Sequence, residues 1–293
     1  MMSVADDIYP ASRIFLSQGL ALHYLDWGNE SAPTLILIHG SNDHARSWDW
    51  TARALKDSFH VVAVDLRGHG DSQWSPDGAY LVAYHVIDLV ELVESLKTHE
   101  KVTIVAHSLG GTIASRYAAM YPERVHKLVL VDGFGPPPAS YAKWLEYGTV
   151  RRTREGIEQR RQSKTKAARR LATIDEAAAR MSAANPHLSQ AQVQHLAAHG
   201  VRQHPNGYGW KFDPRASQFT AEDFAVEITT FWDAVTAPTL LCRGEESWTE
   251  DPGATGQAVH LGNRRSVAIP KAGHWPHHDQ FEAFMAVLHQ FLA

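Results

Sequence analysis

The chain has 293 residues, of which 44% are hydrophobic, and a formal net charge of −4. This length and composition allow a large buried core, either in one domain with an insertion or in two domains. A net negative chain lacks the basic surplus of a nucleic-acid-binding protein, so we expect no nucleic-acid partner.

Other broad classes are excluded by simple sequence features. The first ten residues contain two acids and no apolar stretch, unlike a signal peptide, and no apolar run approaches the ~20 residues of a membrane span. The single cysteine, Cys242, excludes an intramolecular disulfide and lies in an apolar run, so we expect it to be buried. The 18 histidines show no metal-ligand spacing. We therefore expect a cytoplasmic protein without metal or cofactor; oligomeric state is not predicted.

The first half of the chain alternates strand-like and helix-like segments. Continuous apolar runs predict buried strands, and apolar residues at helical spacing predict helices. Such alternation favours a parallel sheet with helices on both faces. We expect strands over Arg13–Leu16, Leu20–Trp27, Thr34–Ile38, Phe59–Asp65, Val102–Val105 and His126–Val131, and helices over Ser47–Lys56, Leu81–Lys97 and Thr112–Met120.

The sequence changes character after Asp132. A run of glycines and prolines, 133–138, breaks regular structure, and residues from about Tyr141 to Trp232 are rich in helix-like patterns. Between Lys143 and Arg180 there are 11 Lys/Arg against 5 Asp/Glu, which indicates a solvated helical surface or a region that attracts acidic molecules. The segment 207–214 is aromatic and looks irregular. Strand patterns then resume at 237–244 and 265–269, and an amphipathic helix over 280–292 closes the chain.

The stretch Val102–Gly111, VTIVAHSLGG, places a serine between a strand and a helix. A sharp strand-to-helix turn of this kind, called a nucleophile elbow, lifts a serine hydroxyl above the sheet, next to the N–H groups of a helix N-terminus. The turn is tight, so the residues two before and two after the serine must be small. Here they are Ala106 and Gly110, and Ser108 is the candidate nucleophile.

Five motifs in order make the chain resemble the α/β-hydrolase superfamily. They are His39-Gly40, the run Arg67–Ser72, the elbow at Ser108, Asp132, and Gly273-His274, each in a loop or at a predicted strand end. The resemblance implies a mostly parallel eight-stranded sheet with a helical cap inserted after the sixth strand. We therefore predict an α/β core over 1–132 and 237–293, and a cap over 133–236.

The resemblance and the chemistry of each residue type suggest roles. His274 is the expected base, since imidazole exchanges a proton near neutral pH and can activate the Ser108 hydroxyl. The backbone N–H groups of Leu109 and Ser41 are the expected oxyanion hole, with Asn42 a weaker alternative to Ser41. No residue in this set requires a cofactor.

The orienting acid is the open assignment. In most of the family the acid follows the seventh strand, where this chain has Ser247 in place of the expected aspartate. A branch of the family places it after the sixth strand, where Asp132 stands. We therefore expect Asp132 to be the acid, with Glu246 as the alternative.

A serine nucleophile with a histidine base points to hydrolysis of a small-molecule carboxylic ester through an acyl-enzyme. Serine argues against haloalkane dehalogenase and epoxide hydrolase chemistry, which the family performs with aspartate at this position. Alternatives are a C–C hydrolase, a lactonase, an amidase, or a binding protein that keeps the fold without catalysis. Substrate size would depend on cavity-lining side chains. For these we expect His107, Trp144, Tyr147 and Trp210, with Tyr208 beside them.

Overall fold

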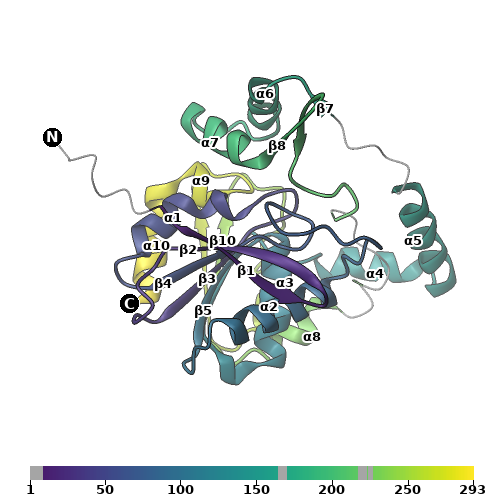
Figure 1. Ribbon diagram of the computed structural model, residues 1–293. Helices are drawn as coiled ribbons and strands as arrows, with labels where there is room; N and C mark the ends of the chain where they lie inside the picture. The colour runs from purple at the N-terminus through teal and green to yellow at the C-terminus, as the bar shows by residue number, and fades with distance from the viewer. Residues whose placement is uncertain (1–8, 164–169, 217–222, 224–226) are drawn as a thin grey trace.

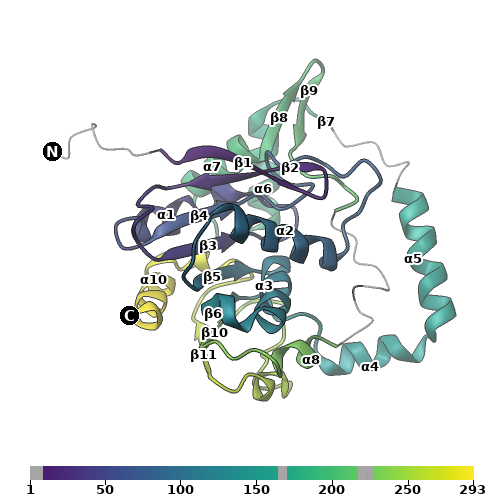
Figure 2. The ribbon, with the colours of Figure 1, turned by 60° about the horizontal axis from the view of Figure 1, so that its bottom comes forward.

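One eight-stranded sheet runs through the chain in the order β1-β2-β4-β3-β5-β6-β10-β11 (Figures 1 and 2). The computed structural model describes residues 9–163, 170–216, 223 and 227–293. The first two strands form an antiparallel hairpin, β2 pairs antiparallel with β4, and all later neighbours are parallel. The predicted mostly parallel eight-stranded sheet is confirmed. The strands are β1 (Ala11–Ser17), β2 (Leu20–Asp26), β3 (Thr34–Ile38), β4 (His60–Val64), β5 (Val102–His107), β6 (Val125–Val131), β10 (Thr239–Gly244) and β11 (Arg264–Ile269).

Both faces of the sheet are covered, because the central strands β3, β4 and β5 are buried at every position. In β3, Leu35 and Leu37 join one buried cluster, and Ile36 and Ile38 join the other, as the two-residue period of a strand requires. Short 3-10 turns stand beside α1 (η1, Ala45–Trp48), α3 (η2, Pro122–Arg124) and α8 (η3, Gln257–His260). The face with Ile36 packs against α2 (Val82–Ser95), α3 (Leu109–Met120) and α8 (Ile228–Trp232), and the face with Leu35 packs against α1 (Asp49–Leu55), α9 (Pro276–Asp279) and α10 (Phe281–Leu292).

The chain between β6 and β10 leaves the sheet and carries its own apolar cluster. That cluster joins α6 (Ile174–Ala184) and α7 (Gln190–Gly200) to a three-stranded sheet of β7 (Arg170–Leu171), β9 (Gly207–Trp210) and β8 (Val201–His204). Two further helices, α4 (Pro138–Glu146) and α5 (Thr149–Ser163), extend outward in both views. Residues 164–169, 217–222 and 224–226 of the predicted cap lie outside the described residues, and its boundaries stay a prediction.

The expectation that segment 207–214 is irregular was wrong for its first half. Gly207–Trp210 is strand β9, which pairs antiparallel with β8 through a two-residue connection, Pro205-Asn206. Gly207 has a φ of +109°, and a Cβ there would lie 2.3 Å from the carbonyl oxygen of Leu171, so only glycine fits. Strands of two to four residues carry too few apolar positions for periodicity to reveal them.

The parallel strands end at one edge of the sheet, where such folds bind ligands. Four residues other than glycine adopt a positive φ in the loops at this edge: Asn42, Ser108, Asp132 and Lys271. This backbone conformation is uncommon for side-chain-bearing residues and costs roughly 1–3 kcal/mol, so the surrounding packing must hold it in place. The edge therefore carries the backbone strain that is typical of functional sites.

Among the described residues, no helix combines the length and apolar character that a membrane crossing requires. The first eight residues, on which the expectation about a signal peptide rests, lie outside the described part.

Candidate active site

Ser108 stands at the turn between β5 and α3 in a strained backbone conformation, with φ 52° and ψ −117°. The chain is crowded there. A Cβ on Gly110 would lie 2.7 Å from the carbonyl oxygens of Ile38 and His39, so glycine is required. The tight turn led us to expect that Ala106 and Gly110 crowd each other, whereas the nearest neighbours of Gly110 are at the end of β3. The strand that carries His39-Gly40 thus packs directly on the elbow.

His274 lies in the loop between β11 and α9, and its Nε2 is 3.1 Å from the Ser108 Oγ. His107 holds this loop, since its Nε2 donates a hydrogen bond of 2.8 Å to the carbonyl oxygen of His274. Burial and the neighbouring His274 lower the pKa of His107 well below its ordinary value, so His107 is a neutral donor. The ring of Trp248, which is 76% exposed, lies 4.6 Å from the His274 ring between centroids.

Asp132 follows β6, and its side chain is fully buried. Its Oδ2 lies 3.3 Å from Nδ1 of His274, the ring nitrogen that faces away from Ser108. This separation is slightly longer than a hydrogen bond, and such contacts often tighten when a substrate binds. The other carboxylate oxygen accepts a 2.5 Å hydrogen bond from the hydroxyl of Thr249. The backbone N–H of Asp132 donates to the carbonyl oxygen of Cys242, which ties β6 to β10.

Glu246, the alternative acid, directs its carboxylate elsewhere. Its Oε2 lies 3.4 Å from Nε2 of His187, and 54% of the side chain is exposed. Ser247, at the position where most of the family has the acid, bonds its hydroxyl to that of Thr249 at 3.0 Å. Of the two candidate acids, Asp132 is the one that the fold brings to His274.

Ser41 and Leu109 flank Ser108 from two different elements. Leu109 begins α3, and Ser41 lies in the turn after β3. A Cβ on Gly40, next to Ser41, would lie 2.9 Å from the Cβ of Ser108, which measures how closely this turn approaches the serine. In the described part of the chain neither N–H has a hydrogen-bond partner. Both backbone N–H groups are therefore free to donate close to the candidate nucleophile.

A cavity of about 400 Å³ opens at Ser108. Its walls come from helix α3, the start of α4 and the loop after β10. None of the four expected substrate-binding residues lines this cavity. His107 is buried beneath His274, and Trp210 stacks on Phe212 in the three-stranded sheet. Trp144 and Tyr147 stand beneath Arg152 and Arg151 at the outer side of α4. The cavity is lined by Ser108, Leu109, Thr112, Arg116, Asp132, Ser140, Tyr141, Trp248, Thr249 and Glu250, among others.

Sequence reasoning missed three of these residues. Thr249 contacts Asp132 across 117 positions of sequence, and Trp248 contacts His274, because β6, β10 and the loop before α9 converge at the sheet edge. Arg116 was overlooked although it follows Ser108 by eight residues. Positions 108, 112 and 116 recur every four residues on one helix face, which is a signal that the sequence does contain.

One group of described residues has metal-ligand chemistry at close quarters: His23, Asp65 and Asp71, with ligand atoms within 4.8 Å of one another. These atoms already bind each other. Nδ1 of His23 lies 2.7 Å from Asp65, the N–H of Asp71 donates to Asp65, and Lys211 pairs with Asp71 at 2.9 Å. The network ties β2 and the loop after β4 to the chain that follows β9.

The family model for the alpha/beta hydrolase fold matches residues 33–281. The chain therefore belongs to the alpha/beta hydrolase fold family, which is a family of hydrolases. Esterase Rv0045c of Mycobacterium tuberculosis is 30% identical over 287 residues, which cover 95% of this chain and 89% of that protein. A solved structure of this esterase superposes with a TM-score of 0.76 at 27% identity, over 97% of this chain and 92% of that one.

Two other similar proteins extend this picture. The serine hydrolase-like protein of Danio rerio is 30% identical over 193 residues, which cover 64% of this chain and 57% of that protein. The structure of E-2-(acetamidomethylene)succinate hydrolase covers 97% of this chain and 99% of its own, with a TM-score of 0.80 at 22% identity. At that identity the match indicates a shared fold.

Proposed function

We propose that the chain is a serine hydrolase that cleaves carboxylic esters, with Ser108 as nucleophile, His274 as base and Asp132 as orienting acid. The observation that carries this proposal is the relay of 3.1 Å from Ser108 Oγ to His274 Nε2 and 3.3 Å from His274 Nδ1 to Asp132. The similarity to a mycobacterial esterase over nearly the whole chain supports an ester as the substrate.

The reaction proceeds in two halves. Nε2 of His274 accepts the Ser108 proton as Oγ bonds to the ester carbonyl carbon, and the carbonyl oxygen becomes an oxyanion. The N–H groups of Ser41 and Leu109 bind this oxyanion, each contributing roughly 3–4 kcal/mol to the transition state. The intermediate collapses when the C–O bond to the alcohol breaks and His274 returns the proton to the alcohol. Water then repeats these steps on the acyl-enzyme and releases the acid.

The carboxylate of Asp132 holds His274 in the tautomer that presents Nε2 as acceptor, and it stabilises the imidazolium that forms. Thr249 keeps this carboxylate in place with its 2.5 Å hydrogen bond. The proposal assigns His107 to positioning, since it bonds to the backbone of His274 rather than to a reacting atom.

The test is active-site labelling with a fluorophosphonate, together with hydrolysis of short p-nitrophenyl esters. We expect the probe to label the wild type and fail on Ser108→Ala, and we expect this variant to lose ester turnover. Labelling without ester turnover would direct the search to lactones, amides or C–C bonds. Neither labelling nor turnover, with a folded protein, would favour a non-catalytic binding role and contradict the proposal.

A further inference from the structure

Arg116 lines the cavity that opens at Ser108. Ser108, Thr112 and Arg116 follow one another every four residues and line the same cavity along α3. With a rise of 1.5 Å per residue, the Cα atoms of Ser108 and Arg116 are about 12 Å apart. Long side chains on a helix lean toward its N-terminus, which directs the guanidinium back along the cavity toward Ser108.

The Arg116 guanidinium is a buried charge with little compensation. The residue is only 9% exposed, and one N–H donates a 2.7 Å hydrogen bond to the backbone carbonyl oxygen of Asp223. Its Cζ lies 5.2 Å from the centre of the Phe231 ring. Within the described part of the chain no carboxylate forms an ion pair with it, and burial lowers its pKa. A desolvated cation of this kind gains most from an anionic partner.

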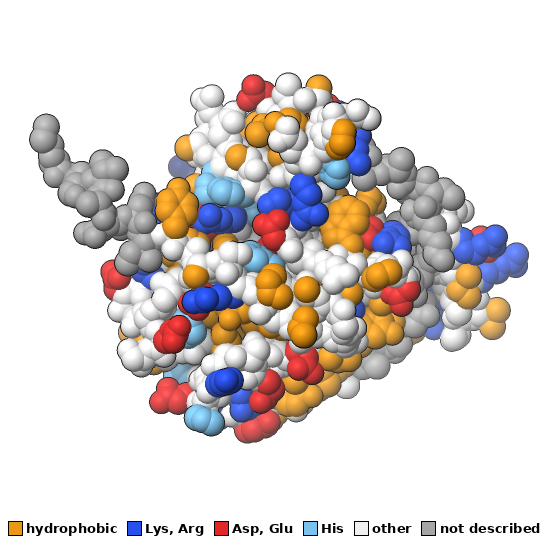
Figure 3. All heavy atoms as spheres, viewed as in Figure 1, with side chains coloured by type: hydrophobic (Ala, Val, Ile, Leu, Met, Phe, Trp, Pro, Cys, Tyr) orange, Lys and Arg blue, Asp and Glu red, His pale blue; other side chains and the backbone are white. Residues whose placement is uncertain are grey.

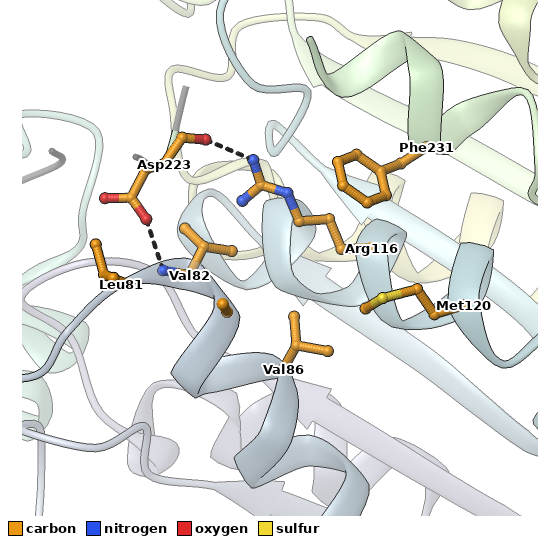
Figure 4. A pocket seen from close by; sticks show the side chains of 8 residues that line it. Leu81, Val82, Val86, Arg116, Met120, Asp223 and Phe231 are labelled. Carbon is orange, nitrogen blue, oxygen red and sulfur yellow. Dashed lines mark hydrogen bonds between the residues drawn. The ribbon is translucent and has the colours of Figure 1, made fainter. Parts of the chain in front are cut away.

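Among the described acids, Asp223 is the one whose charge acts on Arg116, and its carboxylate is already engaged. The carboxylate of Asp223 accepts a 2.7 Å hydrogen bond from the N–H of Val82, at the first turn of α2, and its charge only partly offsets the effect of burial on Arg116. Figure 4 shows these two bonds on opposite sides of Asp223, with its backbone facing Arg116 and its carboxylate facing Val82. Asp223 therefore presents a carbonyl oxygen, not its carboxylate, to the guanidinium.

Two further acids line the cavity, and neither neutralises Arg116. Asp132 belongs to the relay with His274 and Thr249. Glu250 is exposed at the loop after β10, where water screens its charge. Among the described residues, Arg116 is thus a buried cation in a cavity whose other charges are paired or solvated.

There is space beside the guanidinium for a ligand group. A second cavity of about 220 Å³, whose lining is drawn in Figure 4, shares Val82, Arg116 and Asp223 with the first, so Arg116 lines both. An acyl chain that starts at Ser108 and follows α3 would bring its far end to this boundary. A planar guanidinium binds a carboxylate through two parallel hydrogen bonds, which a neutral chain end cannot form.

We propose that Arg116 binds a carboxylate of the substrate, so that the preferred substrates are hemi-esters whose free carboxylate lies roughly 8–12 Å from the scissile carbonyl. This inference rests on the proposed ester hydrolysis at Ser108. The arginine-rich helix α5 supports it, because its five arginines and two glutamates form a positive surface near which anions concentrate. In Figure 3 this surface is at the right, where Lys and Arg side chains gather at the outer end of α5.

The test compares two series of p-nitrophenyl esters, from C4 to C10 in acyl length. One series consists of hemi-esters of dicarboxylic acids, and the other of neutral monocarboxylic esters of equal length. We expect the ratio of kcat/KM, hemi-ester over neutral ester, to pass through a maximum of about 10- to 100-fold in the wild type. Arg116→Gln should lower this ratio to about one, mainly by raising KM for the hemi-ester, and Arg116→Lys should restore part of it.

The matched control is Arg13→Gln, which removes the same charge from the exposed face of edge strand β1 and should leave the ratio unchanged. A wild-type ratio at or below one for every length, or an unchanged ratio in Arg116→Gln, overturns this inference alone. If the wild type turns over neither series, the proposed function is wrong and this inference falls with it. If Arg116→Gln does not fold, inhibition of the wild type by free acids decides. We expect dicarboxylates to inhibit at least 10-fold more strongly than monocarboxylates of equal length, and equal inhibition refutes the inference.

Discussion

Acid should unfold this protein through its buried histidines. Six imidazoles are almost completely inaccessible to water, and burial is the largest cause that lowers the pKa of each. For two of them, His39 and His278, burial lowers the pKa to about 3. In the described part of the chain, both ring nitrogens of His85, His277 and His278 lack hydrogen-bond partners. The six imidazoles whose pKa burial lowers in this way are His39, His69, His85, His107, His277 and His278.

The sign follows from which state binds protons. The folded pKa of each imidazole lies below the unfolded value near 6.5, so the unfolded chain takes up protons first as pH falls. Stability is therefore complete above pH 6.5 and is lost below it. For the five imidazoles whose pKa lies far below this value, the loss at pH 5.5 is about 1.4 kcal/mol each and about 7 kcal/mol together, and His69 acts in the same direction. Asp43, whose pKa burial raises to about 6, returns less than about 1 kcal/mol.

A loss of this size matches the whole stability of an ordinary domain, about 5–15 kcal/mol, so we expect the acid midpoint between about pH 5 and 6. Urea unfolding followed by tryptophan fluorescence at pH 7.5, 6.5, 6.0 and 5.5 measures the proton uptake, which should reach about four protons at pH 5.5. A value below about two would refute the reasoning, because it would mean that these rings are already charged or solvated in the folded state.

A single replacement sharpens this test. His277 stacks on Trp48 with ring centroids 4.4 Å apart, and His277→Phe retains an aromatic ring there without a titrating group. We expect this variant to take up one proton fewer on unfolding and to gain about 1.4 kcal/mol at pH 5.5 relative to the wild type. His289→Gln, at an exposed position on α10, is the control that should leave proton uptake unchanged.

Three further predictions concern the site and its scaffold. Asp132→Asn should lower kcat/KM for a p-nitrophenyl ester by about 10²- to 10⁴-fold, because the imidazole loses its charged partner. The kcat/KM of Glu246→Gln should stay within about threefold of the wild type, and the opposite ranking would assign the acid to Glu246. Thr249→Val removes the hydrogen bond to the Asp132 carboxylate and should lower kcat by about 10- to 100-fold, with Thr249→Ser restoring most of the rate; equal rates would refute this positioning role. Gly110→Ala should lower the free energy of unfolding by about 1–3 kcal/mol or more, since its Cβ would overlap two carbonyl oxygens, whereas Gly262→Ala, with open space around it, should change little in the same urea titration.

The strands of the sheet could be predicted because they are short apolar runs that end in recognisable loops. Val102–His107 and Thr34–Ile38 are buried at every position, and such runs leave little choice but a central parallel strand. The elbow could also be predicted from local sequence, although helix α3 begins at Leu109 rather than at the predicted Thr112. Local residue patterns thus located the elements and the loops that carry Ser108 and His274.

The contacts between those loops could not be predicted from the sequence. The choice between Asp132 and Glu246 depends on which carboxylate points at His274, and that is decided by the pairing of β6 with β10 and by the contact of Glu246 with His187. The cavity-lining residues depend on the path of α4, so aromatic residues proposed from composition alone, such as Trp210, fell outside the cavity at Ser108. Sequence periodicity carries no information on such long-range placement.

The hydrogen bonds between the loops after β6 and β10 bear on how such a site changes in evolution. The hydroxyl of Ser247 contacts Thr249, which in turn donates to the carboxylate of Asp132. The loops after two neighbouring strands therefore meet at one carboxylate, and a carboxylate on the loop after β10 would need only a short reach to the same imidazole. If Asp132 is the acid, a lineage could gain the second acid before losing the first. The strand that carries the acid is then a poor guide to ancestry or substrate among such proteins.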